Sequence, residues 1–112
     1  MANNLSKLTS NAFQVFQSEA PAQAQAWMTA VHQLGEANAL DAKTKALVYI
    51  GVLAAMRLES GLPFHIAHAR QLGATRAEVI SAILTGLPAA GMTVIAALPA
   101  VIQAFDGGEK AP

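Results

Sequence analysis

A helix stop followed at once by a helix start divides the middle of the chain. Gly73 suits the left-handed position that ends many helices. Thr75 and Glu78 then have the spacing of a capping box, in which the threonine hydroxyl and the glutamate carboxylate each accept a hydrogen bond from the other residue's amide. We therefore predict one short helix over residues 62–72 and another from residue 75 through residue 85.

Apolar spacing and helix-breaking residues define the rest of the chain. Apolar residues at helical intervals predict a first helix over residues 6–19, which Pro21 stops because proline lacks an N–H donor. A second helix ends at Gly35, and Asp41 is a suitable N-cap for a third helix that reaches Met56. No run alternates polar and apolar residues, so we predict an all-α fold of about six helices.

Three residues inside these helices carry specific expectations. We expect Trp27 to anchor the second helix in the core. Gly51 lowers helix propensity by about 1 kcal/mol relative to alanine, which indicates a close approach between two helices. Pro99 is expected to kink or divide the last helix, which should begin near Pro88 and end before Asp106.

The composition indicates an oligomer. Hydrophobic residues make up 54% of the 112 residues and charged residues 12%, whereas an average soluble domain is roughly 25% charged. A domain of this size has too little interior for so much apolar surface, so we expect burial between identical subunits. One domain should span residues 1–112, with residues 1–4 and 107–112 as disordered tails.

The charge pattern argues against nucleic acid and membrane partners. Seven cations and seven acids give a formal net charge of +0 without a basic stripe. The uncharged residues 84–105 are long enough to span a bilayer, but they contain Pro88 and Pro99 and lack basic or aromatic flanks, so we expect a buried or interface helix. The first seven residues do not resemble a signal peptide, and we expect a cytoplasmic location.

The stretch over residues 57–73 holds the candidate site. Its helix places His65 and His68 on one face, and Glu59 lies in the preceding turn. A carboxylate near an imidazole raises its pKa and favours acid–base chemistry near neutral pH. The alternative is structural, with one histidine buried and satisfied and the other solvated. The His-x-x-His spacing also suits a metal, but zinc needs three or four ligands and Glu59 is the only obvious third, so we expect no metal.

A family resemblance rests on residues 65–80, His-Ile-Ala-His-Ala-Arg-Gln-Leu-Gly-Ala-Thr-Arg-Ala-Glu-Val-Ile. This run resembles the carboxymuconolactone decarboxylase and AhpD-like superfamily, whose pattern is a histidine, an alanine and then Gly-Ala/Val-Thr-x-x-Glu-Ile. Residues 45–48, Lys-Ala-Leu-Val, look like the family's Lys/Arg-Glu-Leu-Ile. The resemblance covers residues 41–105 and implies an AhpD-like helical domain assembled as a trimer or hexamer.

The peroxidase branch of that superfamily carries Glu-x(11)-Cys-x-x-Cys-x-x-x-His. With its histidine on His65, the two cysteines fall on Leu58 and Gly61 and the glutamate falls on Ala46. The chain contains no cysteine at all. Peroxide reduction of this type needs a thiolate and a resolving thiol, so thiol peroxidase activity is excluded.

The decarboxylase branch, which acts on a carboxylated muconolactone without a cofactor, resembles the chain better. By that resemblance His65 would donate a proton, Arg57 would bind the substrate carboxylate, and Glu59 would orient an imidazole with His68 in support. We therefore expect a cofactor-free, lyase-type enzyme acting on a small carboxylated substrate. The alternative is a non-catalytic binding or assembly protein that kept the fold and lost the thiols.

Overall fold

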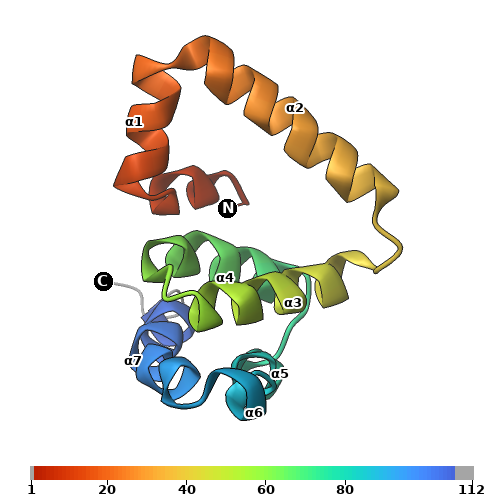
Figure 1. Cartoon of the computed structure of the whole chain (residues 1–112), viewed down its shortest axis with the longest axis vertical. Helices are drawn as coiled ribbons and strands as arrows, with labels where there is room; N and C mark the ends of the chain where they lie inside the picture. The colour runs from red at the N-terminus through yellow and green to blue at the C-terminus, as the bar shows by residue number, and fades with distance from the viewer. Residues whose placement is uncertain (1, 108–112) are drawn as a thin grey trace.

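The structure, a computed structural model, describes residues 2–107 and contains only helices within them (Figure 1). The predicted all-α class is confirmed. The elements in chain order are the 3-10 helix η1 (Ala2–Leu8), α1 (Asn11–Glu19), α2 (Pro21–Ala37), α3 (Ala42–Ala55), the 3-10 helix η2 (Glu59–Gly61), α4 (Leu62–Gln71), α5 (Arg76–Leu84), α6 (Leu87–Ala90) and α7 (Met92–Gly107).

The helices form a packed body and a separate arm. Helices α3 to α7 make the body, while α1 and α2 form a V-shaped arm that stands apart from it at the top of Figure 1. Helix α2 packs mainly on α1, and the segment η1 packs on α4. The core therefore lies within the body, where the largest fully buried side chains are Ile50, Leu62, Ile66, Val79, Ile83, Val94 and Val101.

The predicted helix ends are formed by the expected hydrogen bonds. The Glu78 amide donates to the Thr75 hydroxyl at 3.1 Å, and the Thr75 amide donates to the Glu78 carboxylate at 3.0 Å. Asp41 caps α3 by accepting from the Thr44 amide at 2.8 Å. Gly73 has φ +98°, the left-handed conformation that ends α4. Local sequence therefore sets the starts of α3 and α5 and the end of α4.

Gly51 permits a close contact between α3 and α5. A Cβ atom at Gly51 would lie 2.9 Å from the backbone oxygen of Ala82, inside van der Waals contact. The predicted close approach of two helices at this glycine is confirmed.

The N-terminal helix prediction was wrong in its limits. One helix was expected over residues 6–19, but Ser10 interrupts it and caps α1 by accepting from the Phe13 amide at 3.2 Å. Trp27 is not a core anchor, because α2 stands on α1 and leaves Trp27 55% exposed. Of the expected tails, residues 2–4 belong to η1 and residue 107 ends α7, while residues 1 and 108–112 lie outside the described residues.

The C-terminal prediction was also wrong in detail. The break falls at Gly91, with φ +64°, and separates α6 from α7. Pro99 does not divide α7, where Val94 and Val101 on either side of it are fully buried and fix the helix to the core. The helix also continues past its predicted end, because Arg76 donates two hydrogen bonds of 2.9 Å to the Asp106 carboxylate. Within residues 2–107, no helix has the length and apolar character needed to cross a bilayer.

Candidate functional site

His65 lies near the start of α4, two residues after the first-turn proline Pro63. Its imidazole is partly buried and sits against two aromatic rings. The ring centroid of Tyr49, on α3, is 4.5 Å away with an interplanar angle of 50°. The Phe64 centroid is 5.0 Å away with the rings at 71°. The packing of α3 on α4 therefore places the Tyr49 ring against the His65 imidazole.

The histidine lines a cavity of about 320 Å³ between the arm and the body. This volume is at the lower end of the range for small-molecule pockets, roughly 300–1,000 Å³. Its lining comes from segments far apart in the sequence, with mostly apolar and aromatic side chains: Thr9, Ser10, Phe13, Trp27, Met28, Val31, Tyr49, Leu53, Gly61, Phe64 and His65. His65 is the only residue of this lining with a side chain that titrates near neutral pH.

Burial lowers the pKa of His65 below its ordinary value of 6.5, and the charge of nearby His68 lowers that pKa further. Desolvation disfavours the imidazolium, since a charged group loses its hydration when it enters an apolar environment. No carboxylate lines the cavity to oppose this effect. The site therefore favours the neutral imidazole of His65, which is able to accept a proton.

The other predicted site residues lie outside this lining. The Arg57 Nε atom is 3.1 Å from the Glu59 carboxylate, so these two residues pair with each other. The ring centroid of His68 lies 6.4 Å from that of Phe64, which is also a neighbour of His65. The structure thus brings Arg57 to Glu59 and His65 to Tyr49, and His68 lies near enough to influence His65 electrostatically.

Arg57 has an unusual backbone conformation, with φ +60°. It follows α3 in a Schellman motif, in which the Arg57 amide donates to the Ala54 oxygen and the Leu58 amide donates to the Leu53 oxygen. Gly73 occupies the equivalent position after α4. The left-handed conformation costs a side-chain-bearing residue about 1–2 kcal/mol. Residues held in such strained conformations are common at functional sites.

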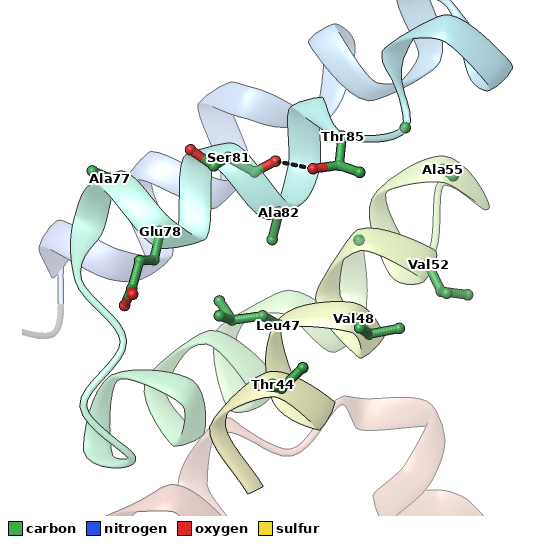
Figure 2. Close-up of a pocket in the computed structure, with 12 residues that line it drawn as sticks. Thr44, Leu47, Val48, Val52, Ala55, Ala77, Glu78, Ser81, Ala82 and Thr85 are labelled. Atoms are coloured by element: carbon green, nitrogen blue, oxygen red, sulfur yellow. Dashed lines mark hydrogen bonds between the residues drawn. The ribbon is translucent and has the colours of Figure 1, made fainter. Parts of the chain in front are cut away.

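A larger hollow between α3 and α5 contains none of the predicted site residues. Its volume is about 680 Å³, and Figure 2 shows Leu47 and Val48 of α3 beside Ala82 of α5. Two of its polar side chains take part in local structure. Glu78 completes the capping box and pairs with Lys43 at 3.0 Å, and the Thr85 hydroxyl donates to the Ser81 oxygen at 2.7 Å. We therefore place the candidate site at His65 and not in this larger, shallower hollow.

No group of three histidine, aspartate or glutamate side chains within residues 2–107 gathers closely enough to hold a metal ion. The chemistry at the cavity therefore has to be argued from His65 and its neighbours.

A family model described as the carboxymuconolactone decarboxylase family matches residues 21–104. The chain belongs to this family. The match extends the expected resemblance from residue 41 back to the start of α2, so it includes both the arm helix and the histidine. Comparison with curated proteins gave no match, and comparison with solved structures gave none either.

In this carboxymuconolactone decarboxylase family member, sequence reasoning missed most of the cavity. Trp27 and Val31 are four residues apart on α2, and Tyr49 and Leu53 are four apart on α3, so each pair shares a helix face. That spacing indicates an apolar helix face, but it does not show whether the face packs in the core or lines a cavity. Only the position of the arm in space brings the two faces together.

Proposed function

We propose that this carboxymuconolactone decarboxylase family member performs cofactor-free, lyase-type acid–base chemistry on a small carboxylated substrate bound beside His65. The observation that carries the proposal is a partly buried histidine with a lowered pKa in the wall of an apolar cavity. The chain has no cysteine, so the proposal excludes thiol peroxidase activity.

The proposed step uses His65 as the proton donor. A substrate carboxylate within about 4–6 Å stabilises the imidazolium and raises the pKa of His65, so the histidine takes up a proton as the substrate binds. Loss of carbon dioxide breaks the bond to the carboxyl carbon and leaves its electron pair on the substrate. The imidazolium donates its proton to the carbon that holds this pair and returns to the neutral form.

We keep Arg57 as the carboxylate-binding residue of this proposal. Its guanidinium now pairs with Glu59, and both side chains are partly exposed, so a substrate carboxylate has to replace Glu59 as the partner. The strained backbone of Arg57 supports this role, since glycine would fit the position with less strain. Glu59 then holds Arg57 until the substrate carboxylate replaces it, and the charge of His68 lowers the pKa of His65.

A non-catalytic binding protein is the second candidate. The specific observation in its favour is that neither Arg57 nor Glu59 lines the cavity, whose surface is mostly apolar. In this case the cavity holds a small apolar ligand, and the neutral His65 only donates or accepts a hydrogen bond.

Release of carbon dioxide from carboxymuconolactone tests the proposal. The proposal predicts turnover by the native protein, a loss of at least about 100-fold in kcat/KM for His65→Gln, and a much smaller loss for His68→Gln. The melting temperature of each variant controls for folding. Equal turnover in His65→Gln and the native protein would reject His65 as the proton donor. Ligand binding without any turnover would favour the binding protein.

A further inference from the structure

The proposed proton donor lies in surroundings that disfavour its charged form. Burial and the charge of His68 both act against the imidazolium of His65. No carboxylate lines the cavity, and the nearby carboxylate of Glu59 pairs with Arg57. A proton donor in this place therefore needs another neighbour that interacts more favourably with the imidazolium than with the neutral imidazole.

The ring of Tyr49 is close enough to be that neighbour. Its centroid lies 4.5 Å from the centroid of the His65 ring, with an angle of 50° between the two planes. This distance is at the short end of the range for packed aromatic rings, roughly 4.5–7 Å. Two rings whose centres are this close cannot meet edge to edge, so the contact involves a ring face. The Phe64 ring is farther away, at 5.0 Å, and more steeply inclined, at 71°.

We propose that Tyr49 is a positioning residue for His65, and that its ring holds the imidazole at the cavity wall and stabilises the imidazolium through a cation–π interaction. A cation within about 6 Å of an aromatic centroid is attracted to the ring face, more strongly where water is partly excluded. The inference rests on the proposed function in taking His65 as the proton donor. It adds the residue that keeps the protonated form accessible, by opposing part of the effect of burial.

No other group is placed to stabilise the imidazolium. Helix α4 packs against α3, α7, η1 and η2. Besides Tyr49 and His68, the titratable or charged residues on these elements and on α4 itself are Lys7, Lys43, Lys45, Glu59, Arg70 and Asp106. None of these six residues lines the cavity, and the charge that acts on His65 is that of His68.

The proposed contact uses only part of the Tyr49 ring. Tyr49 is 47% exposed, and its contact with His65 joins α3 to α4 within one chain. The exposed part of the side chain is therefore available to a subunit interface without loss of this contact. Because Tyr49 is half exposed, its replacement also removes little core burial.

An NMR titration of the His65 imidazole in Tyr49 variants tests the inference. We expect Tyr49→Leu to lower the pKa of His65, with a roughly two- to fivefold larger proton dissociation constant, because the cation–π interaction is lost. Burial alone predicts the opposite change, since the smaller leucine admits water to the imidazole. Tyr49→Phe keeps the ring and should keep the native dissociation constant. Tyr49→Met repeats the test if Tyr49→Leu is unstable in thermal unfolding.

Met28→Ala is the matched control for opening the cavity. Met28 lines the same cavity from α2 and is 41% exposed. We expect its replacement to leave the pKa of His65 unchanged or to raise it. A dissociation constant in Tyr49→Leu that is equal to or smaller than the native value would overturn the inference. So would an equally large increase in Tyr49→Phe or in Met28→Ala.

The two proposals fail in different ways. The expected change in the dissociation constant, without turnover of any carboxylated substrate, would support the role of Tyr49 and reject the lyase reaction. If the protein does turn over substrate, the fall in kcat/KM with rising pH should move to lower pH in Tyr49→Leu but not in Tyr49→Phe. Turnover that depends on His65, with an unchanged pH profile in Tyr49→Leu, would overturn the role of Tyr49 alone.

Discussion

At Arg57 a large charged side chain occupies a backbone conformation that glycine adopts more easily. Its φ of +60° is positive, as is the +98° of Gly73, and both residues hold the same place in a Schellman motif. The exposed ion pair with Glu59 contributes little to stability, since such pairs are worth about 0–1 kcal/mol. The arginine is therefore not explained by stability, which agrees with a role in binding an anion.

Two substitutions at Arg57 distinguish the effect of backbone strain on stability from the effect of removing the charge. Arg57→Gly and Arg57→Ala both remove the guanidinium, but only glycine relieves the left-handed strain. We expect Arg57→Gly to be about 1 kcal/mol more stable than Arg57→Ala. Urea unfolding midpoints at equal m-values measure the difference. Equal stability of the two variants would mean that the position carries no strain.

The lowered pKa of His65 makes stability depend on pH. The folded state resists protonation of His65, whereas the unfolded state takes up a proton near pH 6.5, so the stability present above that pH is lost as the pH falls. We expect the native melting temperature to fall between about pH 7 and pH 5, and His65→Gln to fall less. His32→Gln, on the exposed face of α2, serves as the control.

The carboxylates with lowered pKa values do not account for the fall in melting temperature expected between about pH 7 and pH 5. Asp41 and Glu78 also have lowered pKa values, caused first by hydrogen bonds from the Thr44 and Thr75 amides. Their ordinary values are 3.8 and 4.5, so their contribution is lost at more acid pH. If the melting temperature of His65→Gln fell with pH as much as that of the native protein, burial would not lower the pKa of His65.

Among the elements, the starts of α3 and α5 were predictable because the atoms that form them are neighbours in sequence. The capping box at Thr75 and the N-cap at Asp41 each join residues three positions apart. The arm was not predictable in the same way. Trp27 has the same apolar character as a core residue, and only the long-range arrangement of α2 decides that it lines a cavity.

The sequence does not contain distances between residues of different elements, and this explains which site residues were predicted and which were missed. His65 follows from its residue type and from the family resemblance, and the structure places it in a cavity. The pairing of Glu59 depends on distances that the sequence does not contain, so Arg57 was not recognised as its partner. Tyr49 was missed because its contact with His65 joins α3 to α4.

Two glycines on different helices test the packing of α3 on α5. Gly51→Ala gains helix propensity, but its Cβ would lie 2.9 Å from a backbone oxygen that cannot move easily. We expect a net loss of about 1–3 kcal/mol in unfolding free energy. Gly35→Ala meets only the flexible end of Lys45 at 3.2 Å, so it should be neutral or gain up to about 1 kcal/mol. Equal effects in thermal unfolding would contradict the close-packing account.

For the whole molecule, much apolar surface remains exposed on both the arm and the body. Exposed large residues concentrate on two helices, with Val48, Tyr49 and Val52 on α3 and Trp27 and Leu34 on α2. One face of α7 is instead buried in the core of the same chain. We keep the proposal of a homo-oligomer, a trimer or hexamer by family resemblance, and place its interface on α3 more than on α7.

Light scattering at micromolar concentration tests the assembly. We expect no monomer in the native protein, because obligate interfaces are large and apolar. Val52→Glu, at a 52% exposed position in the hollow of Figure 2, should give smaller species without unfolding. Gln71→Glu, an exposed polar position on α4, is the charge control. A stable native monomer would reject the oligomer.

The most direct test of the account is an NMR titration of the imidazole resonances of the three histidines, with His65→Gln used for assignment. We predict a His65 pKa below 6.5 in the free protein, and a higher pKa when a small carboxylate such as benzoate is bound in place of the substrate. The resonances of His32, exposed on α2, should not move on addition of benzoate. A His65 pKa at or above 6.5 that benzoate leaves unchanged would contradict the placement of the functional site in this cavity.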